Sequence, residues 1–124
     1  ERGVRFVQLF LNDQPWDHHS NIRTRLPSVC RRIDQPSAAL VKDLKQRGLL
    51  ETTIVHWGGE IGRLPVTENQ GAPNKAGRDH NGQGFSIWLA GGGIKRGYVH
   101  GKSDHTGSAP VEAPAPKAAT LRRR

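Results

Sequence analysis

Three apolar runs separated by polar segments organise the first 90 residues of the chain. Residues 4–11 combine β-branched and aromatic side chains in a nearly continuous run, which predicts a buried strand. Residues 53–57 and 85–90 have the same character and predict two further strands. Polar or glycine-rich residues follow each run, so we expect each strand to end in a loop.

A helical pattern lies between the first and second apolar runs. Over residues 37–47, leucine and valine recur at helical spacing between charged residues, which predicts an amphipathic helix. Asp34 is suited to cap its start, and Gly48 is suited to its end. A shorter helix is expected over residues 22–33, with an interruption at Pro27.

The order strand, helix, strand predicts an α/β fold class with a βαβ core. We expect residues 4–11 and 53–57 to be parallel neighbours or near neighbours in a mixed sheet, with the helix on one face. Ligands of such sheets lie beyond the carboxyl ends of the strands, and polar clusters follow both of these runs. The two clusters are therefore expected at the same edge of the sheet.

The remaining segments are richer in glycine and proline. Residues 64–84 form a long polar loop that contains six Gly or Pro residues, and loops of this length are usually functional or disordered. Residues 94–100 are expected to pair as a hairpin after a glycine turn. We interpret residues 1–107 as a portion of one α/β domain and residues 108–124 as a disordered, Ala/Pro-rich basic tail.

Composition and charge narrow the classes of function. Lys and Arg number 19 against 11 acidic residues, a net charge of +8, but the basic residues are scattered and predict no specific nucleic-acid partner. No run approaches the roughly 20 apolar residues of a membrane span. Cys30 is the only cysteine, which excludes an internal disulfide and a multi-cysteine zinc site. Because the chain begins at Glu1 rather than Met, we interpret it as a fragment.

Polar clusters at three places are candidates for chemistry. Asp17, His18 and His19 follow the first strand, and carboxylate with imidazole is a good ligand set for zinc, manganese or iron. Glu60 follows two glycines at the end of the second strand, and His80 lies where the long loop returns to the third. Each group taken alone is equally explained by capping or surface hydrogen bonding. We expect Asp17, His19, Glu60 and His80 to converge at the carboxyl edge of the sheet.

Three segments together resemble one family. Residues 16–21 read Trp-Asp-His-His-Ser-Asn, residues 44–63 end in Gly-Gly-Glu-Ile-Gly-Arg, and residues 77–81 read Gly-Arg-Asp-His-Asn and lead into residues 84–93. Over residues 4–104 the chain resembles the bacterial sulfatase-like proteins of the domain-of-unknown-function family numbered 1501. That family resembles the alkaline-phosphatase superfamily, which includes sulfatases, phosphatases and cofactor-independent phosphoglycerate mutases.

The resemblance implies a divalent metal site, with Zn, Mn or Ca as the ion. It implies that Asp17 and His19 hold the metal together with the distant His80. His18 stands where the commoner form of the family has Thr, so either adjacent histidine is a candidate to face the metal. Glu60 stands where the superfamily often has the Asp of an Asp-His or Asp-Asn pair, so the resemblance implies that it holds a second metal or a water. Ile61 follows it, so the second ligand of that pair is missing.

Two readings of the function follow. The first is the C-terminal portion of a phosphate or sulfate ester hydrolase, inactive alone because the superfamily's nucleophile lies upstream. Arg63 and Arg78 are then candidates to contact the anionic ester, with simple solvation as the alternative. The second is a non-catalytic module that binds metal or a polyanion. Relatives are usually exported through a twin-arginine signal, which is absent from this sequence, so no localisation follows.

Overall fold

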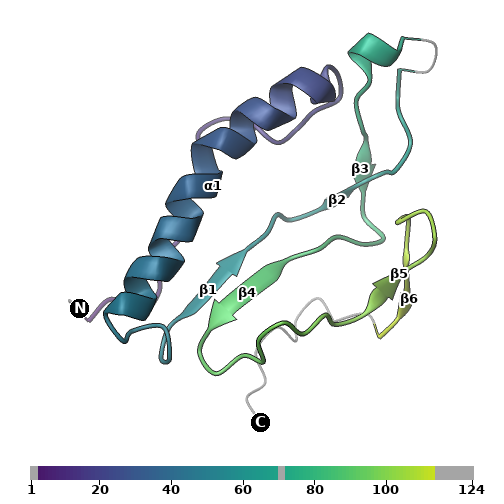
Figure 1. Ribbon diagram of the computed structural model, residues 1–124. Coiled ribbons are helices and arrows are strands. Elements are labelled where there is room, and N and C mark those ends of the chain that lie inside the picture. The colour runs from purple at the N-terminus through teal and green to yellow at the C-terminus, as the bar shows by residue number, and fades with distance from the viewer. Residues whose placement is uncertain (1–2, 70–71, 114–124) are drawn as a thin grey trace.

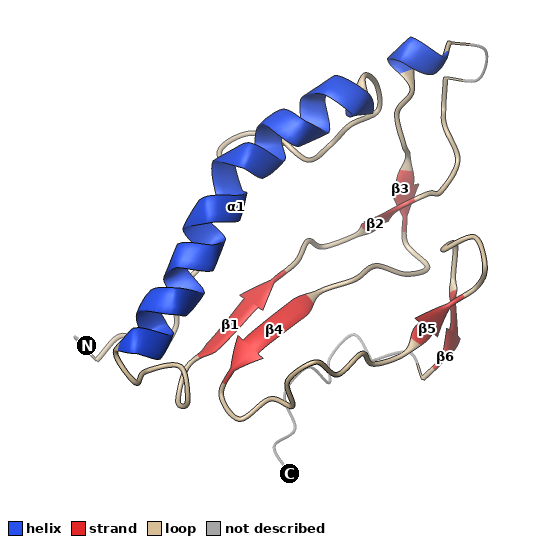
Figure 2. Cartoon of the chain, in the orientation of Figure 1, coloured by secondary structure: helices blue, strands red, loops and turns tan. Residues whose placement is uncertain are grey.

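The computed structural model describes residues 3–69 and 72–113. The described residues contain one long helix and three two-stranded antiparallel sheets, a mixed α/β composition (Figures 1 and 2). In chain order the elements are α1 (Ile22–Gln46), β1 (Ile54–Trp57), β2 (Gly62–Arg63), the short 3-10 helix η1 (Pro73–Lys75), β3 (His80–Asn81), β4 (Trp88–Gly91), β5 (Lys102–Ser103) and β6 (Pro110–Glu112). The pairs are β1 with β4, β2 with β3, and β5 with β6.

The helical region is one helix of 25 residues rather than the two that the sequence predicts. Pro27 and Pro36 both lie inside α1, and Asp34 is an interior residue instead of a cap. A proline removes one backbone N–H donor, but its φ of about −65° is compatible with a helix. The helix continues on both sides of each proline. The predicted end is confirmed, because Gly48 follows the helix with a φ of 69°.

The expected βαβ core is not formed by the described residues. Residues 4–11 belong to no strand, and their large apolar side chains are exposed, with Phe6 78% and Leu9 82% accessible. β1 pairs with β4 in antiparallel register, from Ile54 opposite Gly91 to Trp57 opposite Trp88. An apolar run becomes a strand only when another strand accepts its backbone hydrogen bonds, and no described strand pairs with residues 4–11.

The later expectations are partly wrong. The third strand starts at Trp88 rather than at residue 85, and residues 94–100 contain no strand. The hairpin lies further on, where β5 and β6 are closed by a turn in which Asp104 accepts backbone hydrogen bonds from Thr106, Ser108 and Ala109. Thus residues 110–112, expected to be disordered, form a strand. The expectation for residues 114–124 lies outside the described residues.

The apolar side chains of the described residues form almost no interior. Val29 is the single buried hydrophobic residue among them. The chain exposes 10721 Å² of surface, whereas a compact monomer of 13.7 kDa exposes about 6,600 Å². An open groove of about 690 Å³ lies against α1, β1 and β4, and its lining includes Trp16, Val41, Trp57 and Trp88.

No helix in the described part of the chain has both the length and the apolar character that crossing a lipid bilayer requires.

Candidate metal centre

The loop that precedes α1 is joined by its backbone to a distant segment, residues 72–81. Asn21 and Ile22 donate their backbone N–H groups to the carbonyls of Lys75 and Ala76, at 3.3 and 3.0 Å. The backbone N–H of Arg78 donates to the carbonyl of His18 at 2.9 Å. These bonds satisfy donors at the start of a helix whose N-cap makes no side-chain bond, and they align the two segments.

Gly77 permits this close approach. A Cβ atom placed on Gly77 would overlap the carbonyl group of His19 and the nitrogen of Ser20, much closer than van der Waals contact allows. Both neighbours are backbone atoms, so they cannot move aside as a flexible side chain would. Gly77 is itself buried, and the two backbone segments therefore need glycine at this position.

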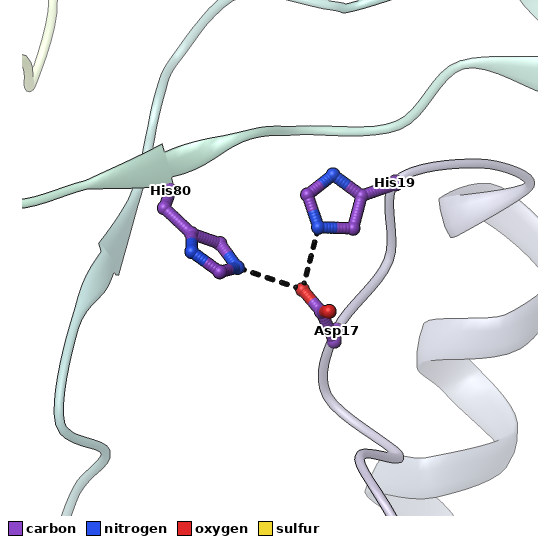
Figure 3. A group of neighbouring side chains, drawn as sticks. All are labelled: Asp17, His19 and His80. Atoms are coloured by element: carbon purple, nitrogen blue, oxygen red, sulfur yellow. Dashed lines mark hydrogen bonds and ion pairs between the residues drawn. The ribbon is translucent and has the colours of Figure 1, made fainter.

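Three side chains from these segments meet at one carboxylate oxygen (Figure 3). Oδ1 of Asp17 lies 2.9 Å from Nε2 of His19 and 3.0 Å from Nε2 of His80, which is 63 residues further along the chain. Their ligand atoms all lie within 4.8 Å of one another. Nitrogen and oxygen ligands about 2.1 Å from a tetrahedral ion are about 3.4 Å apart. The donor atoms and their spacing therefore fit one divalent ion.

Arg63 completes the surroundings of Asp17. Its Nη1 lies 2.6 Å from Oδ1 of Asp17 and also donates to the carbonyl of Arg78 at 3.3 Å. Arg63 stands opposite His80 in the β2–β3 pairing, which brings both side chains to the same carboxylate. Hydrogen bonds first from His80 and then from Arg63 lower the pKa of Asp17 to about 2.

His19 lies between two carboxylates. Nδ1 of His19 is 3.0 and 3.2 Å from the two carboxylate oxygens of Glu68, while its Nε2 faces Asp17. The hydrogen bond to Glu68 is the main reason why the pKa of His19 is raised above its ordinary value of 6.5. Without a metal, the imidazole is therefore held in its protonated form over a wider pH range.

Three of the four expected ligands lie together, namely Asp17, His19 and His80. Glu60 is exposed in the turn between β1 and β2. The described residues contain two ligand groups, that is, sets of three side chains whose ligand atoms all lie within 4.8 Å of one another. Glu60 belongs neither to the group of Asp17, His19 and His80 nor to that of His19, Glu68 and Asp79. Its expected place depended on a parallel sheet edge, which is not formed. The two predicted substrate-binding arginines differ, because Arg63 contacts Asp17 whereas Arg78 contributes backbone groups and its side chain is exposed.

The adjacent histidines have different surroundings. His19 faces the carboxylates, whereas His18 is only 2% exposed and both of its ring nitrogens lack a hydrogen-bond partner among the described residues. The structure thus selects His19 as the histidine of the ligand group.

Two residues that sequence reasoning missed come from the long loop. Glu68 contacts His19 as described above. The side-chain amide of Asn69 donates to the carbonyls of His19 and Lys75, each at 3.0 Å. The only signal in the sequence was the length of the loop, since neither residue belongs to a recognisable local motif.

One family model, described as "Protein of unknown function (DUF1501)", matches residues 1–120. The chain belongs to the DUF1501 family. The match confirms the resemblance to the family numbered 1501 and runs past residue 104, where the resemblance was expected to end. A search of the curated proteins and a search of the solved structures each returned no match. Because the description of DUF1501 states no activity, a function for this chain has to come from its own site.

Proposed function

We propose that this DUF1501 chain carries the metal-holding part of an alkaline-phosphatase-like hydrolase of phosphate or sulfate esters. The observation that carries the proposal is the convergence of Asp17, His19 and His80, from positions up to 63 residues apart, on one carboxylate oxygen. One carboxylate and two imidazoles form the kind of ligand set that leaves a coordination position free for a substrate or water. A divalent ion bound there would polarise the ester and favour a deprotonated nucleophile.

The donor atoms favour one ion. Imidazole nitrogens suit zinc, whereas manganese favours carboxylate, carbonyl and water oxygens and calcium takes six to eight oxygen ligands. Of the three ions that the sequence suggests, zinc therefore fits the group of Asp17, His19 and His80 best. Zinc is the better probe, because it accepts a small number of nitrogen and oxygen ligands.

Arg63 is the residue best placed to bind the ester anion. Its side chain is 25% exposed and lies against Asp17, so it borders the ligand group and still reaches solvent. A planar guanidinium can donate two parallel hydrogen bonds to phosphate or sulfate. The bond from Arg63 to the Arg78 carbonyl holds the guanidinium in position before an anion arrives.

We expect the chain by itself to bind the ion without hydrolysing esters. In the described residues, the hydrogen-bond partners of the three ligand side chains are Arg63, Glu68 and one another, and none is a hydroxyl or a thiol. In the superfamily that the sequence resembles, the nucleophile is a Ser, Thr or Cys side chain that lies upstream of the matched segments, and a hydroxyl or thiol is a common nucleophile of covalent catalysis. Turnover of a chromogenic phosphate or sulfate ester that Asp17→Asn abolishes would contradict this expectation.

The net charge of +8 favours a second candidate, a non-catalytic module that binds a polyanion. Such binding depends on scattered surface charge, so it would weaken steeply with added salt and would not respond to zinc. Two binding measurements separate the candidates. A polyanion module should bind a sulfated polysaccharide in a salt-sensitive way that neither zinc nor Asp17→Asn changes. The metal site predicts instead that the chain binds zinc and that Asp17→Asn weakens this binding.

Calorimetric titration with zinc tests the proposed site. We expect one ion per chain for the wild type, and an affinity at least tenfold lower for Asp17→Asn and for His80→Ala. His105→Ala is the matched control, because His105 is an exposed histidine outside the ligand groups of the described residues. Equal affinity in all four proteins would show that Asp17 and His80 do not share a site.

A further inference from the structure

His19 presents its two ring nitrogens to different carboxylates. Nε2 faces Oδ1 of Asp17 at 2.9 Å, and Nδ1 faces Glu68 at 3.0 and 3.2 Å, although Glu68 lies 49 residues away. An ionised carboxylate only accepts hydrogen bonds, so the contact with Glu68 places a proton on Nδ1. In the metal-free structure Nε2 faces the Asp17 carboxylate and by the same reasoning also carries a proton. An ion that displaced this second proton would meet the lone pair of Nε2, because the remaining proton would stay on Nδ1 against Glu68.

The backbone around Glu68 is anchored to the same segments that carry the ligands. The backbone N–H of Glu68 donates to the carbonyl of Gly77 at 3.2 Å. The neighbouring Asn69 holds the carbonyl of His19 through its side-chain amide at 3.0 Å. The backbone bond to Gly77 and the neighbouring bond from Asn69 to His19 therefore hold the backbone of Glu68 next to His19.

The second histidine provides an internal comparison. His80 also turns Nε2 toward Asp17, yet among the described residues no carboxylate contacts its Nδ1. Among the described residues, the two imidazoles therefore differ in whether a carboxylate contacts the ring nitrogen that faces away from Asp17. Removing the carboxylate of residue 68 changes the surroundings of His19 and leaves the contact between His80 and Asp17 in place.

From this geometry we propose that Glu68 is a positioning residue, which holds His19 as the Nδ1–H tautomer and directs Nε2 to the ion. The inference rests on the proposed metal site. Metal-bound histidines commonly donate their second ring N–H to a carboxylate, and loss of that partner typically weakens metal binding 10–100-fold. The competing arrangement is a second ion held by His19, Glu68 and Asp79, whose ligand atoms also lie within 4.8 Å of one another.

The test compares zinc binding by the full 124-residue chain and its variants. Glu68→Ala removes the acceptor, so we expect one zinc per chain with a 10–100-fold weaker affinity. Glu68→Gln keeps the side-chain shape and an amide oxygen that can accept from Nδ1–H, so its affinity is expected between that of wild type and Glu68→Ala. Glu51→Gln removes an exposed carboxylate far from the cluster in sequence and is expected to bind as wild type does.

A spectroscopic readout separates positioning from a general structural effect. Nitrogen-15 NMR of the zinc-loaded wild type should show His19 protonated at Nδ1 and bound through Nε2. In Glu68→Ala we expect a mixture of tautomers for His19, and unchanged ring-nitrogen signals for His80. Circular dichroism of each variant checks the fold, and Glu68→Gln keeps the test valid if Glu68→Ala is unfolded.

Three results would overturn the inference, and they are distinguishable from failure of the metal site itself. If Glu68→Ala bound zinc with the wild-type affinity while Asp17→Asn lost binding, the metal site would stand and the positioning role of Glu68 would be wrong. Zinc on Nδ1 of His19 would also contradict that role. Two ions per chain, with the second lost in both Glu68→Ala and Asp79→Asn, would make Glu68 a ligand. Absence of zinc binding by the wild type would overturn the site and the inference together.

Discussion

Two regions of this DUF1501 chain are held together by different means. The polar corner, residues 17–22, 62–69 and 72–81, is closed by hydrogen bonds between positions as far as 63 residues apart, and Asn81 and Gly77 are buried in it. The apolar face, residues 4–11 with the groove along α1, exposes large hydrophobic side chains. The ligand geometry is therefore set by directional polar contacts and not by a hydrophobic core.

We predict that one added methyl group in the polar corner lowers zinc affinity more than large side-chain changes on the apolar face do. In Gly77→Ala the new Cβ would meet the backbone of His19 and Ser20, so the two segments must separate. We expect zinc affinity to fall on the order of 100-fold, the upper end of the range for lost ligand support. Gly82→Ala is the control, because a Cβ at Gly82 has no atom within 4 Å. Similar affinities for the two variants would contradict the account.

The polar corner should also respond to pH in two opposite ways. The raised pKa of His19 means that its ion pairs stabilise the metal-free corner fully below pH 6.5, and that this contribution is lost as pH rises through the raised value. The pKa of Asp17, lowered to about 2, means that its contribution is present above pH 3.8 and is lost as pH falls through about 2. Without metal, the corner is therefore expected to be most stable between about pH 4 and pH 6.5.

Proton NMR titration of the metal-free chain measures the His19 value directly. We expect a pKa above 6.5 in the wild type and a lower one in Glu68→Gln, because Glu68 is the main cause of the shift. Zinc binding should weaken as pH falls through this value, since the ion replaces a proton on the ring. An ordinary or lowered pKa for His19 would contradict the contact with Glu68.

Substitutions on the apolar face should have the smallest effect on the site. Phe6 and Phe10 are each 78% exposed, and neither is in the ligand groups of the described residues. Phe6→Ser with Phe10→Ser should reduce binding of a hydrophobic dye while zinc affinity stays within about twofold, because the sites are separate. A tenfold loss of zinc affinity would show that the apolar face supports the polar corner.

Local sequence patterns predicted the parts of the structure that depend on local physics. The amphipathic stretch within α1, the glycine that ends it and the cores of β1 and β4 follow from side-chain spacing and turn chemistry. The three ligands were found because carboxylate and imidazole side chains stood out in their loops. The continuous helix through Pro27 and Pro36 was missed, because an interior proline removes a backbone hydrogen bond and normally kinks or ends a helix.

What was missed depends on partners distant in sequence. Residues 4–11 have the composition of a strand, but no described strand pairs with them. Glu60 was placed by analogy with a parallel sheet edge, and it is exposed in the turn before β2 instead. Glu68 carries no local signature, and its contact with His19 exists only because the long loop folds back across 49 residues.

X-ray absorption spectroscopy at the zinc edge tests the central claim most directly, because it reports the atoms bound to the ion in the loaded chain. The account predicts two imidazole nitrogens and one carboxylate oxygen at about 2.0–2.2 Å, with a water or anion as the remaining light ligand. One imidazole should disappear from the spectrum in His80→Ala. A first shell without imidazole, or the same two imidazoles in His80→Ala, would contradict the site formed by Asp17, His19 and His80.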